Sequence, residues 1–517
     1  MTAKLPSVSP DTPRLRDALL AAGFTSDGLL DLLGAPAYAA LARNETVPAL
    51  RATAEGGPLA TLVRLFLLQE PVPRARAAEV LPLTEALADG WLLPVGAPVG
   101  EGVRASVDVR PYAGPEDGQN WWIVSDLGCA VGGSGGVRTR RWADGEEDPS
   151  SLVLGVGGAS TTLAGITVRT PVDSALDVGC GSGLQALHAA QHASRVTATD
   201  LNPRALRFTE LTLALSGAPA ATLRQGALYE PVSGEGPYDL IVSNPPFVIS
   251  PARSGDPSQL VYRDGGLGGD EVCRTLVSRS VDHLAEGGWC QLLANWQHQD
   301  GQDWRERVAS WVPAGCDAWI VQREVQDVTQ YVELWLRDGG DHWSGPERYA
   351  ERYDAWLRDF EASGTRAVGF GWITLRRTGS ARPSVVAEDW PHPVEQPLGQ
   401  EARAHFERRD FLRDTDDAAL LAQHFRLAEG VLQEQVGPPG AEDPEHVVLR
   451  QQRGMRRATS VDTVAAGFAG VCDGSLSAGR ILDAIAQLLG EDPVGLRDRT
   501  PAAIRLLVEQ GFLLPAD

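Results

Sequence analysis

The stretch ALDVGCGSGLQALHAA, residues 175–190, decides the fold. An apolar strand ends at Asp177, and glycines at 179, 181 and 183 then open a helix. Glycine allows tight turns and close approach of a ligand, and a helix N-terminus adds free N–H groups and a positive dipole end. The G-x-G-x-G spacing differs from the G-x-G-x-x-G of dinucleotide enzymes and from a P-loop. It is typical of a site for a nucleotide-like ligand.

The segment RVTATDLNPRAL carries an acidic residue at the end of the next strand. This residue, Asp200, stands 23 residues after Asp177, and Asn202 and Pro203 then begin a helix. An acidic side chain at this position can accept hydrogen bonds from both hydroxyls of a ribose. The glycine loop and Asp200 together therefore predict a ligand that contains adenosine.

Strands and helices alternate over residues 172–377, which predicts an α/β fold with a parallel sheet covered on both faces. The helical stretch 338–364 is an expected insertion before the last strand. The seven expected strands are ALDVG, RVTATD, ATLRQG, YDLIVSN, WCQLLANW, DAWIVQRE and AVGFGWITLRR.

The segment YDLIVSNPPFVIS, residues 238–250, places Asn-Pro-Pro-Phe directly after the fourth strand, at the sheet edge where ligands bind. The prolines, Pro245 and Pro246, remove two backbone donors and fix φ. The Pro245 carbonyl and the Asn244 side-chain carbonyl can then accept both N–H groups of a planar amine, and Phe247 can stack on it. Such a nitrogen is a poor nucleophile, so catalysis would rest on aiming its lone pair at an electrophilic methyl group.

These motifs resemble the class I S-adenosyl-L-methionine (SAM)-dependent methyltransferases of the (N/D)PP(Y/F) type. This group includes the release-factor glutamine methyltransferases and the small-domain rRNA and tRNA base N-methyltransferases. The resemblance covers residues 172–377 and implies SAM as cofactor. It also implies a seven-stranded Rossmann-like sheet in the order 3-2-1-4-5-7-6 with an antiparallel last strand. The extra regions at each end resemble those of an actinobacterial-type family of predicted methyltransferases.

The resemblance also implies roles for individual residues. Those implied as catalytic are Asn244, Pro245, Pro246 and Phe247. Those implied as cofactor-binding are Asp177, Gly179, Cys180, Gly181, Gly183, Asp200, Leu201, Asn202, Gly226, Ala227 and Asn244. Many relatives have a Gly-Asp pair after the third strand, with the Asp near the adenine amine, where this chain has Gln225-Gly226-Ala227. In this chain the resemblance therefore implies that the backbone or Gln225 contacts adenine. Two further segments resemble the family, one before the glycine loop (154–168) and one after the Asn-Pro-Pro-Phe motif (262–276).

Composition shifts divide the rest of the chain. We expect a helical domain at 1–100, a β-rich lead-in at 101–171, the catalytic domain at 172–379, a linker with helices at 380–460, and a helical domain at 461–517. The segments LTEALADGWLLP and IRLLVEQGFLLP each combine a helix, a glycine, an aromatic residue and a short strand. This pattern is consistent with a winged helix at each end, or with an ordinary helix–strand hairpin.

The chain has 517 residues, with 46 Lys and Arg against 68 Asp and Glu, a net charge of −22 that argues against a wide basic face for duplex DNA. The basic run Arg450, Arg453, Arg456 and Arg457 is either a phosphate contact or a solvated surface. The six cysteines lack zinc spacing, and we expect reduced thiols in a cytoplasmic protein without a metal. The sequence shows no signal peptide and no run of 18 apolar residues, so we expect no membrane association.

Two other features have plain structural interpretations. Eight tryptophans between Trp289 and Trp356 more readily fill the core than stack on bases. His188 and His192 are spaced for a metal, but no acidic or cysteine partner accompanies them.

Four functions fit the sequence. The first is SAM-dependent methylation of an exocyclic base amine in rRNA or tRNA, with RNA as partner. The alternatives are a protein glutamine N5-methyltransferase with a protein substrate, a DNA adenine N6-methyltransferase, and a SAM-binding regulator without catalysis.

Overall fold

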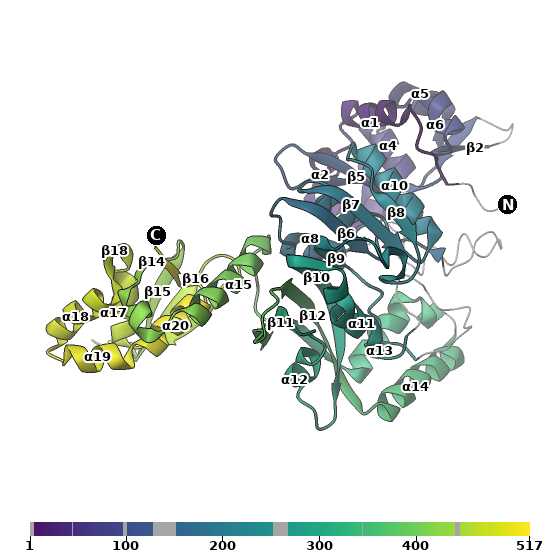
Figure 1. Cartoon of the computed structure of the whole chain (residues 1–517). Coiled ribbons are helices and arrows are strands. Elements are labelled where there is room, and N and C mark those ends of the chain that lie inside the picture. Colours follow the sequence, from purple (N-terminus) through teal and green to yellow (C-terminus); the bar gives the residue numbers. More distant parts are fainter. Residues whose placement is uncertain are drawn as a thin grey trace. The chain divides into compact units, whose positions relative to one another are not determined.

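The computed structural model describes residues 5–43, 45–96, 101–127, 151–251, 267–343, 345–439 and 445–516. The chain divides into two compact units (Figure 1). The first comprises Met1–Ala164 and Thr170–Trp390, and the second comprises Gly165–Arg169 and Pro391–Asp517.

The first unit is built on an eight-stranded sheet in the order β13-β11-β12-β10-β9-β6-β7-β8. Strand β12 is antiparallel to both neighbours, and the other pairs are parallel. The strands are β6 (Val172–Val178), β7 (Ala193–Asp200), β8 (Thr222–Gln225), β9 (Tyr238–Ser243), β10 (Leu284–Gln299), β11 (Cys316–Asp327), β12 (Thr365–Arg377) and β13 (Val385–Asp389). The α/β fold class and the order 3-2-1-4-5-7-6 are confirmed, with β13 as an added edge strand.

The edge strand β13 was not expected, because its residues fall in the predicted linker. Its sequence, VVAED, has only three apolar residues, and none of its side chains is fully buried. A run this short does not distinguish a strand from a linker. Its pairing with β11 is tertiary and leaves little trace in the local sequence.

Helices connect these strands and cover the sheet. They are α8 (Gly158–Ile166), α9 (Leu184–Ala189), α10 (Pro203–Ser216), α11 (Glu271–Arg279) and α12 (Trp304–Ala309), with short turns at Glu230–Val232 and Ser280–Asp282. The expected insertion lies between β11 and β12 as α13 (Val328–Asp338), a turn at Asp341–Trp343 and α14 (Pro346–Ala362). It begins earlier than 338 because Asp327 caps α13, accepting from the N–H groups of Thr329 and Gln330.

Most of the clustered tryptophans fill the core, as expected. Six are buried, Trp335 is half-buried and Trp343 lies on the surface. The buried six are Trp289, Trp296, Trp304, Trp311, Trp319 and Trp356.

The N-terminal part of the first unit is helical and packs on α10. Its helices are α1 (Thr12–Ala21), α2 (Ser26–Leu41), α3 (Val47–Ala52), α4 (Pro58–Leu62), a π-helical turn (Val63–Leu67), α5 (Arg74–Val80) and α6 (Leu83–Ala88). Strands β1 (Val72–Pro73), β2 (Leu92–Val95) and β3 (Gly102–Ala105) form a small sheet, and β4 (Asp108–Ala113) and β5 (Asn120–Ser125) form a hairpin. Phe208, Leu211 and Leu215 of α10 belong to the same core as these helices. A helix and a hairpin do follow one another at α6–β2–β3, and the winged-helix interpretation stays a prediction.

The second unit combines helices with two three-stranded sheets, β18-β14-β19 and β15-β16-β17. Its helices are α15 (Gly399–Asp414), α16 (Asp417–Ala422), α17 (Thr463–Gly470), α18 (Ala478–Leu489), α19 (Pro493–Arg499) and α20 (Pro501–Glu509). Its strands are β14 (His424–Leu427), β15 (Val431–Val436), β16 (His446–Gln451), β17 (Ala458–Val461), β18 (Asp473–Ser477) and β19 (Leu513–Pro515).

Strands β14 to β17 correct the expectation of only linker and helices at 380–460. Strand β15 is exposed along most of its length and rich in Gln and Glu, so the usual apolar alternation is missing. The basic run therefore begins on a strand, where Arg450 pairs with Glu434 of β15 at 2.6 Å.

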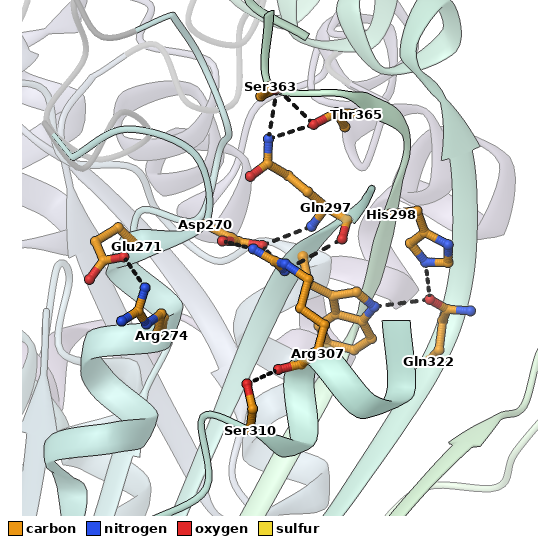
Figure 2. Close-up of polar contacts among 11 residues, drawn as sticks. Asp270, Glu271, Arg274, Gln297, His298, Arg307, Ser310, Gln322, Ser363 and Thr365 are labelled. Carbon is orange, nitrogen blue, oxygen red and sulfur yellow. Dashed lines mark hydrogen bonds and ion pairs between the residues drawn. The ribbon is translucent and has the colours of Figure 1, made fainter. Parts of the chain in front are cut away.

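A buried polar network holds the end of β10 (Figure 2). Arg307 of α12 donates to both carboxylate oxygens of Asp270, at 2.6 and 2.7 Å, and their side chains are only 13% and 5% exposed. Asp270 also accepts the backbone N–H of Gln297, whose side chain donates to Thr365 of β12 at 2.7 Å. The ion pair therefore joins the start of α11, α12 and β10, and Gln297 extends the network to β12.

Substituting Arg307→Met should destabilise the first unit, because it leaves the Asp270 carboxylate buried without its countercharge. We expect a loss of about 3–5 kcal/mol in the free energy of unfolding. The matched control is Arg274→Met, which breaks an exposed pair with Glu271 and should cost at most about 1 kcal/mol. Denaturant unfolding of both variants checks this, and equal losses would contradict the assigned role.

Candidate active site

The predicted glycine loop lies between β6 and α9, and the end of β7 is bonded to it. Gly179, Gly181 and Gly183 all have positive φ, at 76°, 53° and 84°. The Asp200 carboxylate accepts the N–H of Gly181 at 3.0 Å and the N–H of Asn202 at 2.8 Å. The structure therefore brings these expected cofactor residues together at the carboxyl edge of the sheet.

Asp177 lies beneath this loop and supports it. Its side chain is 1% exposed, and it accepts the backbone N–H of Ala186 in the first turn of α9 at 2.9 Å. Burial is the main cause that raises the pKa of Asp177 to about 7; the hydrogen bond from Ala186 acts in the opposite direction and the nearby charge of Asp200 in the same direction. Asp177 thus orients the helix that follows the loop.

Helix α10 packs directly on the loop. A Cβ atom at Gly183 would lie 2.8 Å from the Cα of Thr209, so only glycine fits there. The Thr209 hydroxyl donates to the Gly181 carbonyl and contacts the sulfur of Cys180, both at 3.2 Å. The Cys180 side chain is therefore engaged with α10. Its backbone N–H donates to the Thr199 carbonyl at 3.0 Å and its carbonyl accepts the N–H of Gly183 at 2.8 Å, so Cys180 holds the shape of the loop.

The loop after β8 reaches the same edge. Gly226 donates its N–H to the Asp200 carbonyl at 3.1 Å, and a Cβ atom there would lie 2.6 Å from Pro231. Gln225 donates to the Leu201 carbonyl at 3.4 Å, and Leu201 itself is 57% exposed. Ala227 follows in the same turn. These residues lie where an adenine contact was expected.

The predicted acceptor loop begins where β9 ends. The Ser243 hydroxyl donates to the Val178 carbonyl at 2.8 Å, which fixes this end of β9 against β6. Asn244 donates through Nδ2 to the hydroxyl of Ser160 at 3.2 Å. Its Oδ1 is buried and has no hydrogen-bond partner among the described residues. A buried acceptor without a donor is costly, so this oxygen is available for a ligand N–H.

The rest of the acceptor loop is packed on the core. Pro245 is buried, Pro246 is half-buried, and Phe247 packs as a half-buried ring on the core that contains Ile241 and Leu292. The four predicted motif residues therefore stand together on one fixed turn.

The helical insertion supports this loop from its far end. The hydroxyl of Tyr331 on α13 accepts the N–H of Ile249 at 2.8 Å and the side-chain N–H of Asn295 on β10 at 3.2 Å. Tyr331 is fully buried, and Val248 and Ile249 share its core. Neither Tyr331 nor Ser160 was predicted as a site residue. Tyr331 stands in no motif, and Ser160 lies in the segment 154–168 that resembles the family but was given no role of its own.

The substitution Tyr331→Phe should destabilise the first unit by about 1–3 kcal/mol, because it leaves buried donors of Ile249 and Asn295 unpaired. The matched control is Tyr353→Phe on α14, whose hydroxyl makes only long contacts of 3.4 Å near the surface. Denaturant unfolding should separate the two variants, and a cost for Tyr353→Phe as large as for Tyr331→Phe would refute this support.

Among the described residues, neither His188 nor His192 belongs to a group of three candidate metal ligands. His188 contacts the Tyr112 hydroxyl at 3.1 Å and lies edge-on to Trp121. Within the described ranges, no three His, Cys, Asp or Glu side chains gather as metal ligands do. The five cysteines that the structure describes are buried free thiols.

Among the described residues, no single helix is long and apolar enough to cross a membrane. The bent pair α1 and α2 meets those criteria only when the two helices are taken together.

Comparison with known families gives three matches. Residues 158–306 match the family described as "Methyltransferase small domain". Residues 21–106 and 403–515 match two families described only as domains of unknown function. The first match covers the glycine loop, the end of β7 and the acceptor loop.

The names of similar proteins refer to two kinds of methyltransferase. The release factor glutamine methyltransferase of Deinococcus radiodurans is 39% identical over 122 residues, which are 22% of this chain and 42% of that protein. The ribosomal RNA small subunit methyltransferase C of Salmonella choleraesuis is 28% identical over 180 residues, 34% of this chain and 44% of that protein. The chain thus spans less than half the length of these curated relatives. A solved rRNA methylase from Streptococcus thermophilus aligns at 15% identity with a TM-score of 0.25, covering 43% of this chain and 94% of that one.

Proposed function

We propose that this chain, whose residues 158–306 belong to the methyltransferase small domain family, is a SAM-dependent N-methyltransferase acting on a planar amine. The preferred substrate is an exocyclic base amine in rRNA or tRNA. The observation that carries the proposal is the buried Asn244 Oδ1, an acceptor that has no donor among the described residues. An amine N–H placed there would satisfy it.

The glycine loop fits SAM. No atom lies within 4 Å of where a Cβ would stand on Gly179 or Gly181, so their backbone faces open space. The Asp200 carboxylate stands at the edge of that space, and we assign it to the ribose hydroxyls. We assign adenine to the turn at Gly226 and Ala227, and we place Cys180, Leu201 and Asn202 around the cofactor. The N–H of Cys180 donates to Thr199 and that of Asn202 to Asp200, so these two residues support the site. SAM, when bound, supplies an electrophilic methyl group.

The acceptor loop supplies orientation. Asn244 Oδ1 and the Pro245 carbonyl accept the two N–H groups, which draws the nitrogen towards a tetrahedral geometry and aims its lone pair. Phe247 stacks on the flat base or amide. The principal catalytic contribution is then positioning, which requires no strong base.

A protein glutamine is the second candidate, because the same two acceptors fit a side-chain amide. The likeness to a release factor glutamine methyltransferase and the net charge of −22 favour it. The first arginine of the basic run, Arg450, pairs with Glu434, so it is less available to an RNA phosphate than an unpaired arginine would be. Radiolabelled SAM, supplied with separated RNA and protein fractions, distinguishes these two substrate classes.

The substitution Asp200→Ala should weaken SAM binding by roughly 10–100-fold, since charged hydrogen bonds contribute about 1.5–3 kcal/mol. The control is Arg224→Ala, because Arg224 is engaged with Glu235. Calorimetric titration with SAM measures both. Unaltered SAM affinity in Asp200→Ala would contradict the assignment of the ribose to this carboxylate.

The substitution Asn244→Ala should lower methyl transfer at least about 100-fold, because it removes one of the two oxygens that orient the amine. SAM affinity should stay close to that of the unmodified chain. Transfer of label from SAM to the accepted fraction is the measurement. An active Asn244→Ala variant would show that the acceptor assignment is wrong.

A further inference from the structure

Ser160 connects the acceptor side of the site to the cofactor side. It lies in the first turn of α8, and its hydroxyl accepts the Nδ2–H of Asn244 at 3.2 Å. Its backbone carbonyl accepts the side-chain N–H of Gln185 at 2.7 Å. Gln185 is buried in the first turn of α9, directly after the glycine loop. One residue therefore bonds to both halves of the site.

The bond to Asn244 restrains the plane of its amide. A terminal amide turns readily about its last side-chain bond, and that torsion is broad unless partners restrain it. The Ser160 hydroxyl fixes one end of the amide, and Oδ1 is thereby held in its buried position. With Nδ2 bonded to Ser160, Oδ1 is the end of the amide that remains for the N–H donors of the substrate.

The bond to Gln185 fixes Ser160 in turn. Because Gln185 is 6% exposed, its bond to the Ser160 carbonyl is shielded from water. The neighbouring Thr161 differs. Within the part of the chain that the structure describes, its hydroxyl bonds only to carbonyls at its own helix start, those of Gly157 and Gly158. The arrangement is therefore specific to Ser160 and is not a general property of the hydroxyl-rich start of α8.

We propose that Ser160 is a positioning residue that sets the acceptor oxygen of Asn244 at a fixed place relative to the cofactor loop. This inference rests on the proposed methyl transfer. Ser160 itself touches neither the methyl group nor the amine in this account. It acts by keeping the acceptor oxygen, and so the bound amine, at a fixed distance from the cofactor. A small displacement of the amine from the methyl group strongly reduces the rate of transfer.

The test compares three variants by steady-state kinetics. Ser160→Ala should lower kcat roughly tenfold, the effect of one lost hydrogen bond in a positioning network, with KM for SAM unchanged. Ser160→Thr keeps the hydroxyl and should restore most of kcat. Thr161→Ala, the matched control, should behave as the unmodified chain. Full kcat in Ser160→Ala, the same loss in Thr161→Ala, or failure of Ser160→Thr to restore kcat would each overturn the proposal.

A double-variant cycle tests the connection to α9. Gln185→Met keeps the volume but removes the donor, and it should also lower kcat. The combined Ser160→Ala/Gln185→Met variant should lose less than the product of the two single losses, because both act on one network. Losses that multiply independently would contradict the coupling. Absence of any transfer by the unmodified chain would instead refute the proposed function, which keeps the two failures distinct.

Discussion

The carbonyl oxygen of Asn244 is held out of water without a hydrogen-bond donor among the described residues, and the surrounding structure has to offset that cost. Three contacts hold the loop that carries it. Ser243 is tied to β6, Asn244 is tied to α8 through Ser160, and Ile249 is tied to the helical insertion through Tyr331. These partners come from three separate segments of the chain. The insertion between β11 and β12 thus forms part of the support of the acceptor loop.

Charge is distributed to match this chemistry. The acceptor pair proposed for the amine is neutral, and the acidic groups lie on the cofactor side, at Asp177 and Asp200. Burial raises the pKa of both carboxyls, while backbone N–H groups stabilise their charged forms. A cationic sulfonium brought near them would favour their ionised forms. The net negative charge of the whole chain therefore affects which substrate can bind, and it does not affect the proposed transfer step.

The sequence predicts the site because its motifs are local. The glycine loop, Asp200 and Asn244–Phe247 each follow a strand within a few residues, and parallel strands bring their carboxyl ends to one edge. The strand order also follows, because the family resemblance supplied it. Strands β13 and β14–β17 were not predicted, since they are short and their pairing is tertiary, and β15 is also largely polar. Ser160 and Tyr331 could not be assigned either, because they stand 84 and 82 residues from Asn244 and Ile249 in the chain.

The central claim is that the acceptor loop presents a planar –NH2 nitrogen to the methyl group. The most direct measurement is the position of an isotopically labelled methyl group in the product, determined by mass spectrometry of digested RNA and protein after incubation with labelled SAM. The account predicts label on a nitrogen that was an exocyclic base amine or a glutamine amide. Label on a ring carbon, a ribose oxygen or a carboxylate would contradict it.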